Sequence, residues 1–164
     1  MTELRAQHEF AAPVDAVIAA ISEPGYHAAL DLPDVAPPEL LRHEVEGART
    51  IVEVRFEFAG TLDPIARRIV GNDRIAWIQT IALDPLARRA ELVIRPDVRN
   101  VKVTCRGTFT FVELATDHSR RNLVGELKVH VPLVGGRAEA AIAPGIRRRL
   151  DLEAEGLARR LARD

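Results

Sequence analysis

Cysteine is nearly absent from this sequence, since Cys105 is the only one among 164 residues. A single cysteine excludes an internal disulfide and any metal site built from several thiolates. The five histidines show neither His-x-His nor His-x-x-x-His spacing, so we expect no metal site, and no motif indicates a cofactor. Cys105 falls on the apolar face of a predicted strand, where a buried thiol is expected to be an inert, small apolar group.

Long apolar runs are also missing. No stretch approaches the roughly 18 residues that a membrane span requires, and the N-terminus has no apolar segment of the signal-peptide type. The formal net charge is −1, which argues against bulk electrostatic binding to nucleic acid. We therefore expect a cytoplasmic protein with one domain over residues 1–164, no nucleic-acid partner and no stable membrane insertion. The oligomeric state stays open.

Lysine is rare among the 23 basic residues, where only Lys102 and Lys128 are not arginine. Arginine clusters such as Arg147, Arg148 and Arg149 could contact phosphates. They alternate with acidic residues of the same predicted helix, so we interpret the cluster as a solvated helix face. Aromatic residues make up only 4% of the chain, so aromatic stacking is not a dominant theme.

The sequence does contain repeated two-residue alternation of apolar and polar side chains, which is typical of half-buried strands. It predicts strands at residues 4–10, 39–47, 49–60, 74–83, 89–96, 100–114 and 120–131. Leu41, His43 and Val45 form the predicted inward face of the second strand. Gly107 and Gly125 interrupt two apolar faces, which indicates a bulge or bend and a strongly curved sheet.

Helical patterns stand at both ends of the chain. A helix over 11–22 and a short second helix or turn over 23–33 follow the first strand, and 61–73 is predicted as a short irregular or helical crossing. Apolar residues recur mostly every four positions over 136–163, which predicts a long final helix. Pro144 lies inside it and predicts a kink or an interruption.

This order of elements predicts an α+β fold. A curved antiparallel sheet of about seven strands must cover its apolar face, and the long C-terminal helix is the only element large enough. A bent sheet around a single helix rarely fills the space between them. We therefore expect a pocket there.

Two stretches carry a family resemblance. The opening HEFAAPVDAVIAAISEPGYHAAL is similar to the usual start of the START-like (SRPBCC) superfamily, which has the helix-grip fold and includes plant pollen-allergen proteins, lipid-transfer domains, and bacterial polyketide cyclases and aromatases. VHVPLVGGRAEAAIAPGIRRRLDLE resembles a narrower bacterial branch of unknown function, in which a Val-Pro-Leu-Val-Gly-Gly segment precedes the final helix and an acidic residue, here Glu139, follows.

The resemblance implies a cavity for an apolar small molecule, such as a lipid or a polyketide-like metabolite. Whether any reaction is catalysed stays open. The alternatives are a cyclase or aromatase-like enzyme and a co-chaperone-like protein-interaction module, because a shared fold does not carry function with it. No catalytic residue is transferred, since no catalytic motif of these enzymes matches this chain.

The predicted inward positions supply candidate ligand-binding residues. Trp77 and Gln79 are the most informative, because an inward amide is costly unless it forms hydrogen bonds; Gln79 is therefore paired, edge-exposed or directed at a ligand. The alternative is that these side chains are simply core. The full set is Phe56, Phe58, Trp77, Gln79, Val103, Phe109, Leu127, Ile142 and Ile146.

Two further features have competing interpretations. His8 and His43 form a possible polar part of the cavity, because the resembling fold suggests neighbouring strands, and a histidine pair could hold a proton near neutral pH. The alternative is that each histidine forms its own separate hydrogen bonds.

The glycine pair before the last helix could cradle a phosphate, but it lacks phosphate-loop spacing. We interpret it as a hinge, with Leu133 and Val134 packed under the helix and Glu139 completing the helix dipole.

Overall fold

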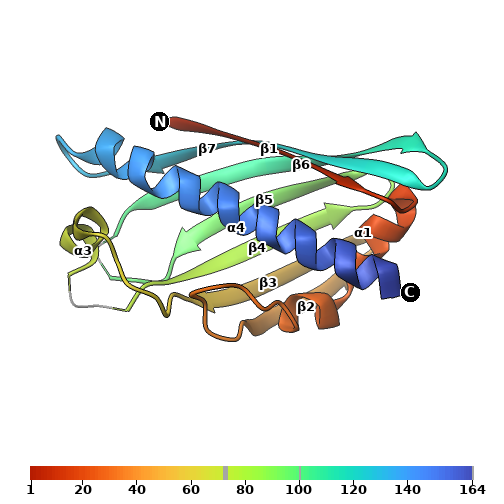
Figure 1. The fold of residues 1–164 in the computed structure, drawn as a ribbon, viewed down its shortest axis with the longest axis horizontal. Coiled ribbons are helices and arrows are strands. Elements are labelled where there is room, and N and C mark those ends of the chain that lie inside the picture. Colours follow the sequence, from red (N-terminus) through yellow and green to blue (C-terminus); the bar gives the residue numbers. More distant parts are fainter. Residues whose placement is uncertain (72–73, 100, 164) are drawn as a thin grey trace.

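The computed structural model describes residues 1–71, 74–99 and 101–163, and within these ranges seven strands form one antiparallel sheet (Figure 1). The strand order is β1-β7-β6-β5-β4-β3-β2. The strands are β1 Thr2–Phe10, β2 Glu39–Glu46, β3 Arg49–Glu57, β4 Ala76–Asp84, β5 Arg89–Pro96, β6 Val103–Ala115 and β7 His118–Val129.

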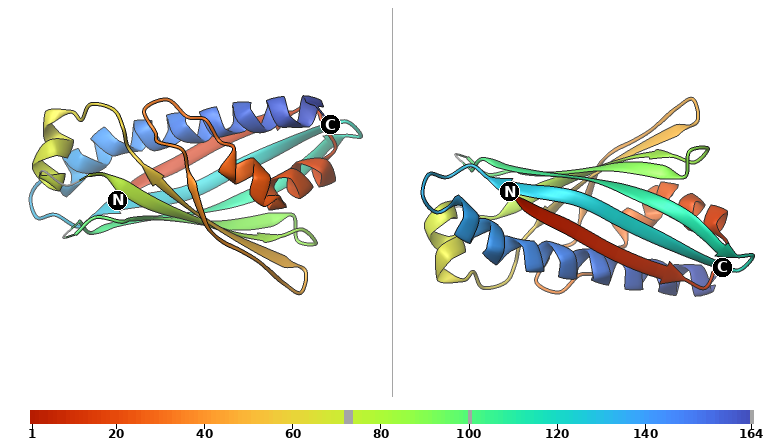
Figure 2. Two further views of the ribbon diagram at one scale, coloured as in Figure 1. Left: turned by 90° about the horizontal axis from the view of Figure 1, so that it is seen from below. Right: turned by 90° about the horizontal axis from the view of Figure 1, so that it is seen from above.

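Four helices occur in the described part of the chain, and the longest lies across one face of the sheet (Figures 1 and 2). They are α1 Val14–Ser22, α2 Pro24–Ala28, α3 Pro64–Val70 and α4 Gly135–Arg163. The predicted α+β helix-grip fold is confirmed, including two short helices after the first strand. The predicted crossing over 61–73 contains α3, while residues 72–73, and residue 100 at the start of a predicted strand, lie outside the described residues.

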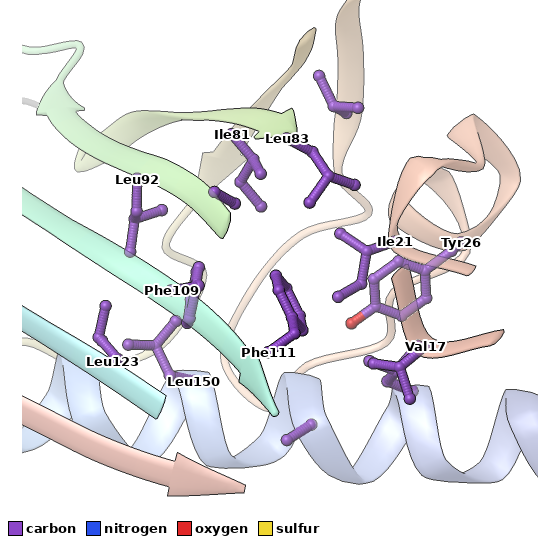
Figure 3. Packing of buried hydrophobic residues seen from close by; sticks show 14 of the residues in the cluster. Val17, Ile21, Tyr26, Ile81, Leu83, Leu92, Phe109, Phe111, Leu123 and Leu150 are labelled. Carbon is purple, nitrogen blue, oxygen red and sulfur yellow. The ribbon is translucent and has the colours of Figure 1, made fainter. Parts of the chain in front are cut away.

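The apolar core occupies one end of the space between sheet and α4. Figure 3 shows Ile21 and Tyr26, from α1 and α2, beside Leu83 and Phe111 of the sheet, while Val17 of α1 lies next to α4. All five are buried. The alternating strands therefore place their apolar faces as predicted, and the two short helices fill this end of the fold.

At the other end of the space, α4 contacts α3 instead of α1 and α2. α4 packs on β1 and β7, while the sheet curves away from it toward β4 and β3 (Figure 2).

Gly107 and Gly125 lie directly opposite each other on β6 and β7. A Cβ atom at Gly125 would lie 2.5 Å from the Arg106 carbonyl oxygen, so glycine permits close strand contact here without the bulge that we considered.

The start of α4 differs from the sequence prediction. Of the two outcomes predicted for Pro144, a kink or an interruption, the interruption does not occur, since the helix is continuous through this residue. Pro144 and Ala140, whose carbonyl loses its helical partner, both lie on the exposed side. Leu133 is fully exposed at a φ of 69° and Val134 is 41% exposed. These two residues therefore do not pack under the helix, and the prediction that they would was wrong.

Glu139 also has a different role from the predicted one. Its buried carboxylate accepts hydrogen bonds from the Thr2 hydroxyl at 3.1 Å and the Val129 N–H at 3.1 Å, and it pairs with the Met1 ammonium at 2.8 Å. These partners lower the pKa of Glu139 to about 2. The side chain ties β1 and β7 to α4 rather than completing the helix dipole.

The predicted inward face of β2 is exposed. Leu41 is 42% and Val45 65% exposed, and His43 is exposed as well. His43 and Val45 lie opposite the buried Val52 and Thr50 of β3, so their predicted face is correct. A register shift between Leu40 and Arg42 places Leu40, rather than Leu41, opposite the buried Val54. The burial fails because β2 is an edge strand, and the β2–β3 hairpin projects beyond the helices (Figure 2).

Candidate functional site

A cavity of about 420 Å³ lies between α4 and the curved-away part of the sheet. Its volume falls within the roughly 300–1,000 Å³ that small-molecule pockets occupy. The wall combines residues 141–152 of α4 with side chains from β4, β5 and β6, and segments 32–35 and 58–63 close one side. Most of the wall is apolar, including Leu32, Val35, Ile75, Ile94, Val101 and Leu152.

Five of the sequence-predicted ligand residues line this cavity: Phe58, Trp77, Val103, Ile142 and Ile146. The other four are buried but are not part of its wall, and these are Phe56, Gln79, Phe109 and Leu127. Periodicity, of two residues in the strands and mostly four in the final helix, identified the inward face in all nine cases. It could not separate positions under α4 from positions beside the cavity, because both are equally apolar.

Arg149 is the central polar residue of the cavity wall. Its Nη1 donates to Gln79 Oε1 at 2.9 Å and to Glu153 Oε1 at 3.2 Å. The guanidinium carbon lies 5.3 Å from the ring centres of both Phe56 and Trp77, which stack on each other at 5.6 Å. A carboxylate, an amide and two aromatic faces therefore hold one cation in a fixed position.

The buried side chains around this cation form one network. Arg149 is only 8% exposed, Glu153 4% and Gln79 3%. The inward Gln79 amide is therefore paired, the first of the three predicted alternatives, because its oxygen accepts a hydrogen bond from Arg149. The interpretation of Arg147, Arg148 and Arg149 as a solvated face is wrong for Arg149 alone, since Arg148 is exposed and Arg147 half-buried.

Two donors at this wall have no acceptor among the described residues. They are Nη2 of Arg149 and Nε1 of Trp77, both buried at the atom level. Both residues line the cavity. The residues of this wall therefore carry two N–H groups without an acceptor, and protein atoms cover both nitrogens.

Cys105 also lines the cavity, from β6. Burial raises the pKa of its thiol to about 11, so the thiol stays protonated at neutral pH. Since the thiolate is the nucleophilic form, this geometry agrees with an inert, apolar role. Asp34 and Arg148 lie at the rim, where both are exposed.

His8 and His43 do not come together. Their strands β1 and β2 are the two opposite edges of the sheet, so the predicted approach of the two rings was wrong. His43 Nε2 instead lies 2.9 Å from the Ser22 carbonyl oxygen, a contact in which the ring donates. Neither histidine lines the cavity.

His8 belongs to a second polar cluster near β7. The Arg121 guanidinium donates to His8 Nδ1 at 3.1 Å, which leaves the proton on Nε2 to be donated to Asp151 at 2.8 Å. Burial, together with the Arg121 charge, lowers the pKa of His8. Arg121 also lies 4.5 Å from the ring centre of Phe109, so this cluster anchors β1 and β7 to α4.

Neither a metal centre nor a membrane span is found in the described chain. No three His, Cys, Asp or Glu side chains there lie together as metal ligands would. None of the described helices is both long and apolar enough to cross a membrane.

Among the polar residues of the site, sequence reasoning missed Arg149 and Glu153. Their spacing could have indicated them, because positions 142, 146, 149 and 153 follow the four- and three-residue steps of one helix face. The run of neighbouring charges obscured this pattern. Position on the helix, rather than residue type, decides which of the three arginines points inward.

Comparison with solved structures shows the fold. A protein from Thermus thermophilus, TTHA0849, has a TM-score of 0.66 at 18% identity, with 98% of this chain and 97% of that chain covered. The Zhui aromatase/cyclase from Streptomyces sp. R1128 has a TM-score of 0.66 at 16% identity, with 99% and 94% covered. A START superfamily protein from Mycobacterium smegmatis has a TM-score of 0.58 at 14% identity, with 98% and 97% covered.

At these identities the similarity shows a common START-like fold and nothing about activity. Among proteins with curated descriptions, none matches the sequence significantly. The model of a family described as protein of unknown function, DUF2505, matches residues 5–161. This chain therefore belongs to the DUF2505 family, and its fold is the helix-grip fold of START-like proteins.

Proposed function

We propose that this protein binds an apolar small molecule, a lipid or a polyketide-like metabolite, in the cavity between α4 and the sheet. The observation that supports the proposal most is the cavity of about 420 Å³ with its largely apolar wall. Apolar surface that leaves water contributes about 25 cal/mol per Å² to binding. A ligand of matching size would be held mainly by this burial.

The chemistry of the wall favours sequestration over catalysis. General acid–base work at neutral pH requires a group whose pKa lies near the working pH. Cys105 is protonated, and no histidine is found among the described residues of the wall. The two carboxylates of the lining, Asp34 and Asp63, belong to exposed residues. An aromatase/cyclase role therefore has less support than binding, although the Zhui aromatase/cyclase shares the fold.

An interaction module would need a filled core and a large exposed apolar patch. The open cavity contradicts the first of these conditions. Binding of a small molecule therefore remains the best-supported function.

The test is native mass spectrometry of protein purified without detergent. We expect wild-type protein to carry an additional apolar mass. Ile146→Trp, which places an indole ring into the cavity, should lose that mass and still fold. Val124→Trp is the matched control, because Val124 is 50% exposed on β7 and should retain the mass. If wild-type protein carries no additional mass and also fails to take up added fluorene, an apolar tricyclic compound, the proposal is wrong.

A further inference from the structure

Unused hydrogen-bond donors at one cavity wall indicate part of the ligand's chemistry. Nearly all buried polar groups in proteins have a partner, and a buried donor without one destabilises the fold. Nη2 of Arg149 and Nε1 of Trp77 lack a partner among the residues that the structure describes. The other two unpartnered nitrogens of this kind, Nε of Arg120 and of Arg121, belong to β7 and not to the cavity wall.

The two donors belong to one compact group. The guanidinium carbon of Arg149 lies 5.3 Å from the Trp77 ring centre, and both side chains line the cavity. Gln79 and Glu153 both bind Nη1, which leaves Nη2 unoccupied. The contacts that fix the guanidinium therefore leave its second nitrogen without an acceptor, and a fixed donor lowers the entropy cost of binding.

The charge balance at the wall limits which hydrogen-bond acceptor the ligand can carry. Glu153 already supplies one negative charge to Arg149 at 3.2 Å, and the side chain of Glu153 is buried. A ligand carboxylate would add an unbalanced charge to an apolar cavity, which is costly. A neutral carbonyl oxygen accepts hydrogen bonds without that charge.

We infer that the ligand is an apolar molecule with a neutral carbonyl oxygen, which accepts hydrogen bonds from Arg149 Nη2 and Trp77 Nε1 after the protein atoms that cover these nitrogens shift. This inference rests on the proposed binding function and adds the polar group by which the ligand is oriented. Arg149 and Trp77 are then ligand-binding residues, while Glu153 and Gln79 position Arg149. The apolar body would lie against the aliphatic side chains Ile142, Ile146 and Val103.

Three tricyclic probes distinguish the binding of an apolar molecule from the recognition of its carbonyl group. Fluorene is apolar, fluorenone adds one carbonyl to the same skeleton, and fluorene carboxylate adds a negative charge. Isothermal titration calorimetry gives their affinities for wild-type protein. Because a hydrogen bond to a charged group contributes about 1.5–3 kcal/mol, we expect fluorenone to bind about 10 to 100 times more tightly than fluorene, and fluorene carboxylate to bind more weakly than fluorenone.

Variants assign the preference to the two donors. Trp77→Phe keeps a ring on Phe56 but removes Nε1–H, and Arg149→Met removes the guanidinium. In wild-type protein, the charge-assisted hydrogen bond should make the affinity for fluorenone about tenfold or more higher than that for fluorene. Each variant should reduce this affinity ratio by about threefold or more. Arg147→Met is the matched control from the same helix and should leave that preference unchanged. If Arg149→Met does not fold, Trp77→Phe still tests the inference.

The outcomes are distinguishable. Equal binding of fluorene and fluorenone to wild-type protein would overturn the carbonyl inference and leave the proposed function standing. Tighter binding of fluorene carboxylate than of fluorenone would overturn the assignment of a neutral acceptor. Failure of all three probes to bind would count against the proposed function itself. An unchanged preference in Trp77→Phe and Arg149→Met would place the carbonyl elsewhere.

Discussion

Removing the carboxylate of Glu153 should destabilise the fold strongly. Glu153 and Arg149 are 4% and 8% exposed, and the variant Glu153→Ala would leave a buried guanidinium with Gln79 as its remaining polar partner. The hydrogen bond from the Tyr26 hydroxyl survives, because it ends on the Glu153 main-chain oxygen at 3.0 Å. The substitution therefore isolates the ion pair.

The separation of the pair sets the magnitude. At 3.2 Å and an effective dielectric constant of about 20, two unit charges attract each other by about 5 kcal/mol. Desolvation offsets much of this attraction in the intact pair. Breaking the pair does not recover that cost for Arg149, so we expect the free energy of unfolding to fall by about 3–5 kcal/mol.

Urea unfolding followed by circular dichroism measures this effect, provided that the m-value is unchanged. Glu155→Ala, an exposed site on the same helix, is the control and should change stability by about 0.5 kcal/mol or less. The double variant Arg149→Met with Glu153→Leu removes both charges and should cost less than Glu153→Ala alone, although Gln79 loses its donor. If the free energy of unfolding of Glu153→Ala lies within about 1 kcal/mol of the wild-type value, the buried ion pair does not hold Arg149 as described here.

Three further results are expected. The pKa of His8 is lowered in the native state, so the stability that His8 contributes is present above the unfolded pKa of about 6.5 and is lost as pH falls through the native pKa. His8→Gln should therefore reduce the loss of unfolding free energy between about pH 7 and pH 5, as measured by urea unfolding. An unchanged loss would refute this role of His8. Gly125→Ala should destabilise by about 1–3 kcal/mol and more than Gly107→Ala, because its Cβ would meet main chain whereas that of Gly107 meets the Leu123 side chain; equal melting temperatures would contradict this. Cys105, with a pKa of about 11, should react with iodoacetamide at about pH 8 roughly a hundredfold more slowly in native than in unfolded protein; similar rates would contradict its burial.

The sequence predicted the fold well, because strand alternation depends on local burial. Trp77 and Ile146 were placed correctly on inward faces by periodicity alone, and both line the cavity. Val45 shows the limit of this reasoning. Periodicity identifies the face of a strand, but it does not show whether another element covers that face.

The polar part of the site was predicted less well. Arg149 was assigned to a solvated face because charged neighbours surround it in the chain, although its spacing from Ile146 places both on one helix face. His8 and His43 were expected to meet, yet the strand order separates them by the width of the sheet. Pairing between distant strands depends on the whole topology, which short-range patterns do not contain.

A crystal structure of the protein with fluorenone bound tests the central claim most directly. We expect the ring system to fill the cavity between Ile146 and Val103, with the carbonyl oxygen within hydrogen-bond distance of Arg149 Nη2. Fluorenone bound only on the outer surface, or a cavity closed by rearranged side chains, would contradict the proposal that this space is a ligand-binding site.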